Sequence, residues 1–289
     1  MSHRHSTGAR CAATALCVAL ALQAAGCSRV ETPKITPVTA KYRIAADGAT
    51  LTLMRALTDA YTAKHPTVTF TVAEDNAQTA ADAIYSRSAD LASVSLLPPR
   101  TADRPAPWIA DLASEGVSII VNPANPLENL STQELRDIFA GVRSRWSDLG
   151  VTGLGDIDVG VREDGDGTRA LFDQRVMEST KLALSDIVLP SIEVTMNFVA
   201  YQPTAIAYVP SARITGTVMP IVKVVGIDGQ KPTLDAIASG AYPLTHMLNL
   251  IALGEPQGEL RQFVAWAVGP NGQAIVAKMN YVSPMQGKR

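Results

Sequence analysis

Residues 157–169 combine residue types and spacing that suit the binding of a small anion. They read IDVGVREDGDGTR: a short strand, a glycine-rich loop and the start of a helix. The first-turn N–H groups of a helix have no partner inside it and carry partial positive charge. Gly167 lets a ligand approach the backbone, Thr168 offers a hydroxyl, and Arg162 can donate two hydrogen bonds to one anion. The segment therefore predicts an anion site.

Asp166 lies in the middle of this loop and conflicts with a simple anion site, because it adds negative charge. Three roles remain open for it. It caps its own helix, which weakens anion binding. Alternatively, it accepts the proton of a monoprotonated oxyanion, since an ionised carboxylate can only accept hydrogen bonds. In the third case, the site binds a ligand with a cationic or hydroxyl group.

Strands and helices alternate along the chain and must position this loop. The strand candidates are 42–46, 68–72, 90–95, 117–121 and 205–209, and the helix candidates are 51–61, 79–86, 131–141, 260–267 and 273–279. Ser131 and Glu134 form a capping box at the start of one helix, and Gly141 is placed to end it. This alternation predicts an α/β protein with mostly parallel sheets.

The first residues have the pattern of an export signal. Arg4 and Arg10 precede an apolar stretch that ends in AAGC at residues 24–27. The stretch is too short for a comfortable permanent membrane helix, and small residues before a cysteine resemble a bacterial lipobox. We therefore expect a lipoprotein signal peptide at 1–26 and a lipid on Cys27. Residues 27–40, which contain two prolines, are expected to be an extended tether.

Composition excludes several other classes of protein. The three cysteines (Cys11, Cys17 and Cys27) lie in or at the end of the signal, so no disulfide or thiolate metal site is expected in the mature chain. Without the signal, 23 basic residues face 27 acidic ones, which argues against a nucleic-acid partner. Only His65 and His246 remain as histidines, and neither belongs to a readable catalytic or metal-binding cluster. We expect no enzyme activity, no metal and no cofactor.

Several sequence segments, in order along nearly the whole mature chain, resemble the substrate-binding proteins of bacterial phosphate ABC transporters. These segments are VNPANPLENL at 121–130, LRDIFAG at 135–141, WSD at 146–148, AIAYV at 205–209, SGAYPL at 239–244 and GQAIV at 272–276. The resemblance implies a two-lobed Venus-flytrap fold of the type 2 periplasmic-binding-protein class. Each lobe would be a mostly parallel sheet flanked by helices, with the ligand in the cleft between the lobes.

The resemblance also implies domain boundaries. Lobe 1 is expected to comprise 41–117 and 213–289, and lobe 2 to comprise 118–212. The two strands that cross between the lobes and serve as a hinge are placed near 117–121 and after Val209.

Anion contacts carry over from the family by position. The predicted ligand-binding residues are Ala49, Thr50, Ser95, Arg162, Asp166, Gly167 and Thr168. Thr50 and Thr168 are expected at helix N-termini that face one cleft, although either could be a simple N-cap. The chain departs from the family at Asp166, where the family has serine, and at 76–79, where it has a Ser-Gly-rich stretch. Asp47 is expected to be a turn residue.

Together these features predict an exported, lipid-anchored solute-binding protein on the periplasmic side of the bacterial cell envelope. It would be a monomer that captures phosphate or a similar tetrahedral oxyanion and passes it to the permease subunits of an ABC importer. The alternative is a non-transport envelope lipoprotein on the same scaffold, which binds another ligand or a protein partner.

Replacing Cys27 tests the predicted anchor. Two or three acyl chains on this cysteine would hold the protein stably on a membrane, whereas one chain is marginal. Cys27→Ala should therefore release the protein or leave its signal uncleaved, as measured by cell fractionation and by the mass of the N-terminal peptide. A variant that is processed and stays on the membrane like the wild type would show that the lipoprotein prediction is wrong.

Overall fold

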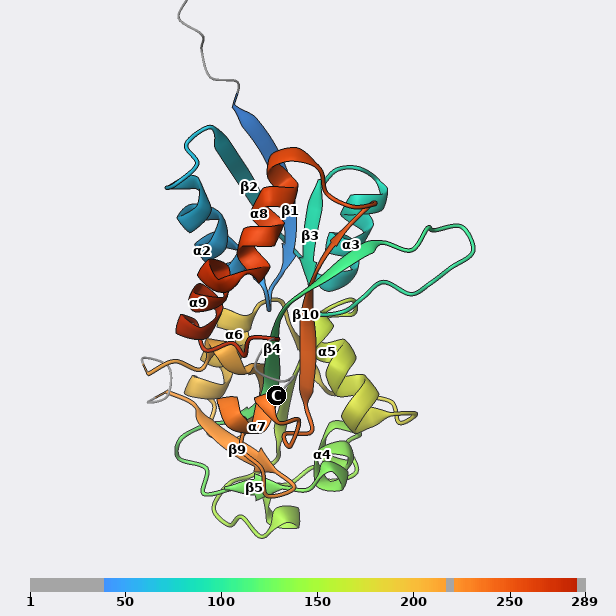
Figure 1. Ribbon diagram of the computed structural model, residues 1–289. Coiled ribbons are helices and arrows are strands. Elements are labelled where there is room, and N and C mark those ends of the chain that lie inside the picture. Colours follow the sequence, from blue (N-terminus) through green and yellow to red (C-terminus); the bar gives the residue numbers. More distant parts are fainter. Residues whose placement is uncertain (1–38, 217–220, 285–289) are drawn as a thin grey trace, which may run out of the picture. The chain divides into compact units, whose positions relative to one another are not determined.

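A computed structural model of the protein describes residues 39–216 and 221–284 (Figure 1). The predicted signal peptide, Cys27 and nearly all of the predicted tether lie outside the described residues. Among the residues that are described, no helix has both the length and the apolar character needed to span a membrane.

The described chain alternates strands and helices, as the sequence predicted. The strands are β1 (Ala40–Asp47), β2 (Val68–Asp75), β3 (Leu91–Val94), β4 (Trp108–Val121), β5 (Asn129–Leu130), β6 (Asp158–Arg162), β7 (Ile187–Leu189), β8 (Ala205–Pro210), β9 (Lys223–Ile227) and β10 (Thr245–Ala252). The α-helices are α2 (Leu51–Thr62), α3 (Ala77–Tyr85), α4 (Thr132–Phe139), α5 (Gly167–Phe172), α6 (Ile192–Tyr201), α7 (Leu234–Ala238), α8 (Gly258–Val268) and α9 (Pro270–Lys278). Short helices are η1 (Trp146–Leu149), η2 (Asp173–Met177) and η3 (Ser211–Arg213).

The strands form one hydrogen-bonded path in the order β2-β1-β3-β10-β4-β8-β6-β7, and β9 joins this path at β4. Pairs at the two ends of the path are parallel, whereas every pair that contains β4 or β10 is antiparallel. The α/β prediction is confirmed. The expectation of separate, mostly parallel sheets is corrected to one mixed sheet, because β4 is long enough to pair with β10 along its first half and with β8 along its second.

Of the two long strands in the middle of this path, β4 was predicted only in part and β10 was not predicted. Only 117–121 of β4 was predicted, because the strand begins with alternating half-buried and exposed positions and its first half lacks a continuous apolar run. The strand β10, which begins Thr-His-Met, was not predicted. Its pairing with β4 runs from Thr245 beside Gly116 to Ala252 beside Trp108 (Figure 1).

A cluster of aromatic side chains holds the helix that carries the glycine-rich loop. The rings of Phe172 on α5 and Tyr208 on β8 stack at 4.5 Å between centroids, and Phe139 on α4 lies 4.5 Å from Phe172. All three side chains are buried. The residue that precedes the loop is fixed as well, because the N–H of Arg162 donates to the Tyr208 hydroxyl at 3.3 Å.

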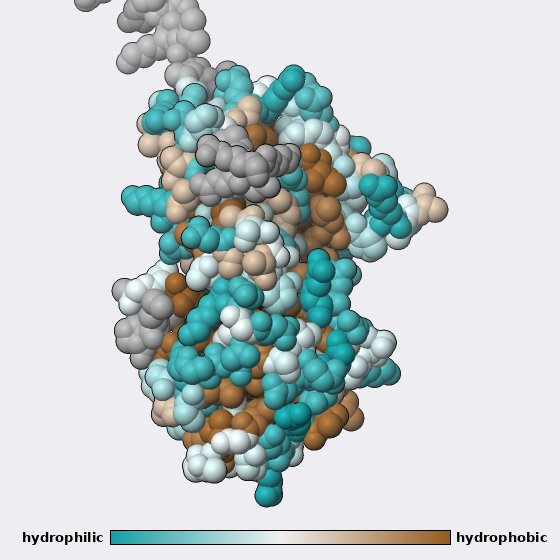
Figure 2. All heavy atoms as spheres, turned by 60° about the horizontal axis from the view of Figure 1, so that its bottom comes forward, coloured by the Kyte–Doolittle hydropathy of each residue, from teal (hydrophilic) through white to brown (hydrophobic). Residues whose placement is uncertain are grey.

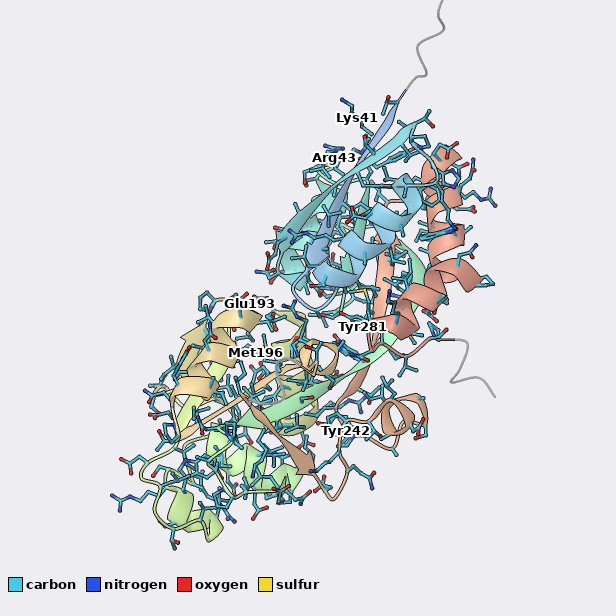
Figure 3. The ribbon with its side chains drawn as sticks, turned by 90° about the vertical axis from the view of Figure 1, so that its left-hand side faces the viewer. Lys41, Arg43, Glu193, Met196, Tyr242 and Tyr281 are labelled. Carbon is cyan, nitrogen blue, oxygen red and sulfur yellow. The ribbon has the colours of Figure 1, made fainter. Side chains whose placement is uncertain are left out.

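Tyrosine hydroxyls and one ion pair connect segments that are far apart in the chain. Tyr281, which follows α9, donates to the carbonyl of Ala49 at 2.8 Å, and Tyr242 donates to the carbonyl of Val117 at 2.7 Å (Figure 3). Arg213 pairs with Glu193 on α6 and donates to the hydroxyl of Thr52 at 3.0 Å. The loop before α2 is therefore tied to distant parts of the chain.

The segment 222–244 packs on the same buried cluster as residues from 118–212. Val225, Ile227 and Tyr242 belong to this cluster together with Leu135 and Phe172. The strand β9 pairs in parallel with β5 and antiparallel with the end of β4.

Hydrophilic side chains cover much of the face in Figure 2, with apolar patches between them.

A close helix–helix contact provides a test of this packing. A Cβ atom on Gly272 would lie 2.2 Å from the carbonyl oxygen of Ala267, so Gly272→Ala must push α9 away from α8. We expect the free energy of unfolding to fall by about 1–3 kcal/mol in denaturant titrations. The control is Gly155→Ala, where an added Cβ meets nothing within 4 Å and the expected change is within about 0.5 kcal/mol. Equal stability of the two variants would contradict this packing.

Candidate functional site

Three loops carry the predicted ligand-binding residues and meet in one place. They follow β1, β3 and β6, and each leads away from the end of a strand that pairs in parallel with a neighbour. All seven predicted residues are buried: Ala49, Thr50, Ser95, Arg162, Asp166, Gly167 and Thr168.

The loops after β3 and β6 touch each other directly. A Cβ atom on Gly167 would lie 1.9 Å from the Oγ of Ser95 and 3.2 Å from the Cβ of Ala77. The N–H of Gln78, in the first turn of α3, donates to the carbonyl of Gly165 at 3.2 Å. The described form is therefore closed at this point, with no space for a side chain between Ser95 and Gly167.

The side chains of Thr50 and Thr168 are not simple N-caps. Thr50 precedes α2, but its hydroxyl donates to the carbonyl of Ser93 at 2.9 Å and makes no cap hydrogen bond. Thr168 lies inside the first turn of α5, whose N-cap is Asp166. The simple-cap alternative is wrong for both side chains, because one hydroxyl bonds to a neighbouring strand and the other follows the capping residue.

Asp47, expected to be only a turn residue, is the most connected acceptor at this site. Its buried carboxylate accepts the N–H of Thr50 at 3.0 Å and both the N–H and the hydroxyl of Ser95, at 2.6 and 2.5 Å. Burial raises the pKa of Asp47; the hydrogen bonds from Ser95 and Thr50 oppose this shift, and the negative charge of Asp166 adds to it. The sequence did contain a signal for this role, because an acidic residue ends a strand immediately before Gly-Ala-Thr.

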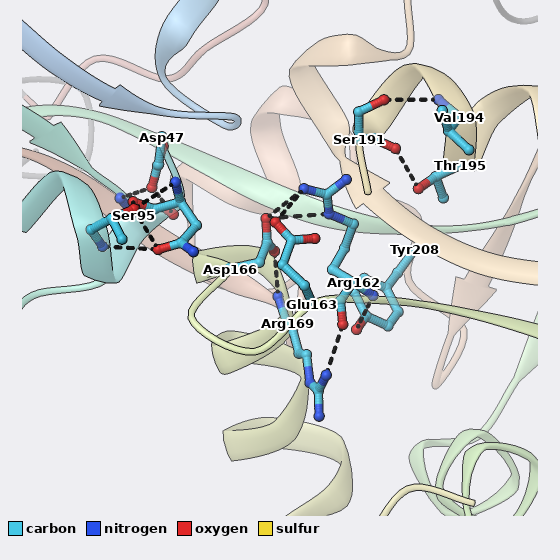
Figure 4. A network of polar contacts seen from close by, with 12 residues as sticks. Asp47, Ser95, Arg162, Glu163, Asp166, Arg169, Ser191, Val194, Thr195 and Tyr208 are labelled. Carbon is cyan, nitrogen blue, oxygen red and sulfur yellow. Dashed lines mark hydrogen bonds and ion pairs between the residues drawn. The ribbon is translucent and has the colours of Figure 1, made fainter. Parts of the chain in front are cut away.

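Asp166 caps its own helix and pairs with the arginine of the same loop. One carboxylate oxygen accepts the N–H of Arg169 at 2.9 Å, and the other lies 3.3 Å from both Nε and Nη2 of Arg162 (Figure 4). Arg162 Nη2 also donates to Glu163 at 3.1 Å. Asp166 therefore has the geometry of the first role considered for it, the N-cap of its own helix. Two carboxylates of its own loop, those of Glu163 and Asp166, therefore enclose the Arg162 guanidinium.

A second arginine holds the loop in shape. Arg169 donates to the carbonyl of Arg162 at 2.8 Å and pairs with Asp164 at 2.8 Å and Asp173 at 3.4 Å. These contacts lie on the outer side of the loop, where the Asp164 side chain is 93% exposed. Arg169 therefore acts on loop conformation, and Arg162 is the arginine placed at the site itself.

A buried acid–histidine pair lies behind Ser95 and was not recognised from the sequence. Glu115 on β4 contacts Nε2 of His246 on β10 at 3.3 Å, and Nδ1 of His246 lies 3.2 Å from the carbonyl oxygen of Ser95. Burial raises the pKa of Glu115, the hydrogen bond from His246 opposes this shift, and the charge of Asp47 adds to it. The sequence offered no signal, because the two residues are far apart in the chain and β10 was not predicted.

The buried charge at the site is mostly negative. Within residues 39–216 and 221–284, the buried carboxylate and guanidinium side chains are those of Asp47, Glu115, Asp166 and Arg162. The same residues contain no group of three or more His, Cys, Asp or Glu side chains arranged to hold a metal ion.

Comparison with known proteins places this geometry in a family. Residues 31–271 match the family described as "PBP superfamily domain". A curated relative, the phosphate-binding protein PstS of Bacillus subtilis, is 28% identical over 172 residues, which are 59% of this chain and 56% of that protein. The chain thus matches about half the length of its curated relatives. These relatives are named as binding proteins, in agreement with the prediction that this chain is not an enzyme.

Solved structures support the same fold. A phosphate-bound structure from Clostridium perfringens, described as a phosphate ABC transporter substrate-binding protein, superposes with a TM-score of 0.78 at 21% identity, over 84% of this chain and 99% of that one. A phosphate transport receptor from Vibrio cholerae gives 0.71 at 23% identity, over 84% and 100%. With the match over residues 31–271, the α/β fold and the three converging loops, the chain belongs to the PBP superfamily domain family and is a distant relative of the phosphate-binding proteins of ABC transport.

Proposed function

We propose that this protein is an extracytoplasmic solute-binding protein that captures phosphate or a similar tetrahedral oxyanion for an ABC importer. The observation that carries the proposal is the meeting of three loops. Asp47 accepts hydrogen bonds from Ser95, and Ser95 contacts Gly167 on the loop that follows Arg162. An arginine beside helix N-termini is a favourable environment for an oxyanion. The names of the curated relatives and the phosphate-bound structural neighbour point to the same ligand class.

The ligand would bind between two lobes that share the strands β4 and β10. We assign 41–117 and 245–284 to one lobe, and 118–216 and 221–244 to the other. This differs from the sequence-based boundary at 213, because 222–244 packs with residues of 118–212. The hinge would then lie where Gly116 pairs with Thr245, and the second crossing would be β10 rather than a segment after Val209.

Ligand entry requires the loops after β3 and β6 to separate. Ser95 packs against Gly167, and Gln78 at the start of α3 donates one hydrogen bond to Gly165. A further hydrogen bond between the proposed lobes runs from Arg213 to Thr52. A hydrogen bond exchanged for one with water contributes only about 0.5–1.5 kcal/mol, so an open form lies within thermal reach. Closure around a ligand by hinge motion is a known response of two-domain binding proteins.

Export and anchoring remain part of the proposal. They are supported by the sequence of residues 1–27, and the permease partner is supported by the names of relatives that belong to ABC transport. The alternative, a non-transport lipoprotein on the same scaffold, would be favoured if the gene stood without neighbouring permease and ATPase genes. Calorimetry of the purified mature protein against phosphate, sulfate and arsenate tests oxyanion binding, and no heat from any of them would contradict it.

Arg162 is the residue whose removal should weaken oxyanion binding most. We expect Arg162→Ala to lose about 1.5–3 kcal/mol of binding free energy in calorimetry, because a charge-assisted hydrogen bond disappears. It should also lower the free energy of unfolding by about 1–3 kcal/mol, since buried Asp166 loses an ion-pair partner. Arg145→Ala is the control, because the Arg145 side chain is 69% exposed and pairs only with exposed Asp156. Unchanged anion affinity in the Arg162 variant would exclude this site.

Gly167 tests whether the contact between the loops is needed for binding. In Gly167→Ala the new Cβ would overlap Ser95, so the loops could not reach the described closed arrangement. We expect ligand affinity to fall by about tenfold or more, since misplacement by about 1 Å at a built site is costly. Gly155→Ala, with open space around its Cβ, should bind like the wild type. Equal affinities of the two variants would show that closure at Ser95 and Gly167 is not part of binding.

A further inference from the structure

We infer that the ligand of this site carries an ammonium group beside its oxyanion, as a small aminoalkyl phosphonate or phosphate ester does. The oxyanion would bind to Arg162, and the ammonium group would lie against Asp47 and Asp166. The inference rests on the proposed oxyanion-binding function and names the class of ligand that fits the charges of the site.

Several hydrogen-bond donors near the site are already used inside the protein. Asp47 accepts the N–H of Thr50 and both donors of Ser95, and Asp166 accepts the N–H of Arg169. A phosphate that took over these donors would leave two buried carboxylates without their partners. Each of these aspartates thus stands where a bound anion would otherwise accept hydrogen bonds.

The balance of charge also favours a ligand with a cationic group. Asp47 and Asp166 are buried near a single buried arginine, Arg162. Glu115 is already paired with His246, whose side chain is 8% exposed. Asp47 bonds to Ser95, and Ser95 contacts Gly167, the residue after Asp166, so the two carboxylates lie near each other. Their charges repel, and burial strengthens this repulsion because the surroundings screen it poorly. A dianionic phosphate adds to the excess of negative charge. An ammonium group between the two carboxylates offsets it.

Arg162 nevertheless keeps one donor for an anion. Its Nε and Nη2 are engaged by Asp166 and Glu163, but its Nη1 is buried and has no partner among the described residues. The Arg162 side chain is only 7% exposed, so water does not readily accept a hydrogen bond from Nη1. Figure 4 shows this guanidinium next to Asp166 and Glu163. Glu163 has one buried oxygen without a partner as well. An unused donor and an unused acceptor on adjacent residues suit a ligand that carries both charges.

A comparison of three small ligands tests this inference on the purified mature wild-type protein. Calorimetry at pH 7 would measure 2-aminoethylphosphonate, ethylphosphonate, which lacks only the amino group, and inorganic phosphate. We expect 2-aminoethylphosphonate to bind about tenfold to a hundredfold more tightly than either other ligand, the range for a hydrogen-bonded charge pair.

Each other result overturns the inference in a distinguishable way. If phosphate and ethylphosphonate bind as tightly as the amino ligand, the inference fails while the proposed oxyanion-binding function stands. If phosphate binds better as the pH falls and the amino group gives no advantage, the two aspartates hold a proton instead of an ammonium group. If none of the three ligands binds, the proposed function fails as well.

Variants at the two aspartates locate the ammonium group. Asp166→Asn and Asp47→Asn keep the side-chain shape and remove one charge each, so both should lose most of the preference for 2-aminoethylphosphonate over ethylphosphonate. The control is Asp156→Asn, away from this loop, whose side chain is 79% exposed and should not affect the preference. Circular dichroism checks that each variant folds. If Asp47→Asn does not fold, the result for Asp166→Asn alone decides the test. A preference retained by a folded Asp166→Asn variant would place the ammonium group elsewhere and overturn the assignment.

Discussion

The antiparallel pairing of β4 with β10 is the constraint on which the rest of the structure depends. The parallel pairs of β1, β2 and β3 reach the remaining strands through β10, and the pairs of β6, β7 and β8 do so through β4. The same pair brings Glu115 opposite His246, and His246 contacts the carbonyl of Ser95. A change in the register of these two strands would therefore displace the loop after β3. The bulge between Leu248 and Asn249 marks the point where the pairing shifts to reach β3.

The loops that meet at this pair are shaped by buried carboxylates as much as by the arginine. Asp47 joins the start of α2 to the end of β3 through three hydrogen bonds, and Asp166 joins the start of α5 to Arg162. Burying a carboxylate is unfavourable unless donors surround it, and here the backbone supplies several of them. Internal acceptors thus engage several donors of these loops.

Sequence reasoning succeeded where the signal is local and failed where partners are distant. The helix α2, the capping box of α4 and the loop of Arg162 follow from patterns within a few residues, and the structure contains them. The roles of Asp47, Glu115 and His246 depend on contacts more than 40 residues apart along the chain. The strands β9 and β10 carry polar residues at one end, so their hydrophobic pattern is incomplete. Whether Arg162 would be open or enclosed depended on the rotamers of Glu163 and Asp166, which no sequence pattern specifies.

These internal contacts determine what a ligand must accomplish. The affinity of a ligand depends on two sets of contacts. The contacts that the ligand makes strengthen binding, and the contacts within the closed loops that it breaks weaken binding. A ligand that merely replaces the carboxylates of Asp47 and Asp166 as acceptors gains little, since the protein already makes those bonds. A ligand that leaves them in place and adds to the unused donor of Arg162 gains the full value of each new contact. At the proposed site, selectivity would therefore arise from the hydrogen bonds and charges that the protein has left unpaired, more than from those that it has already satisfied.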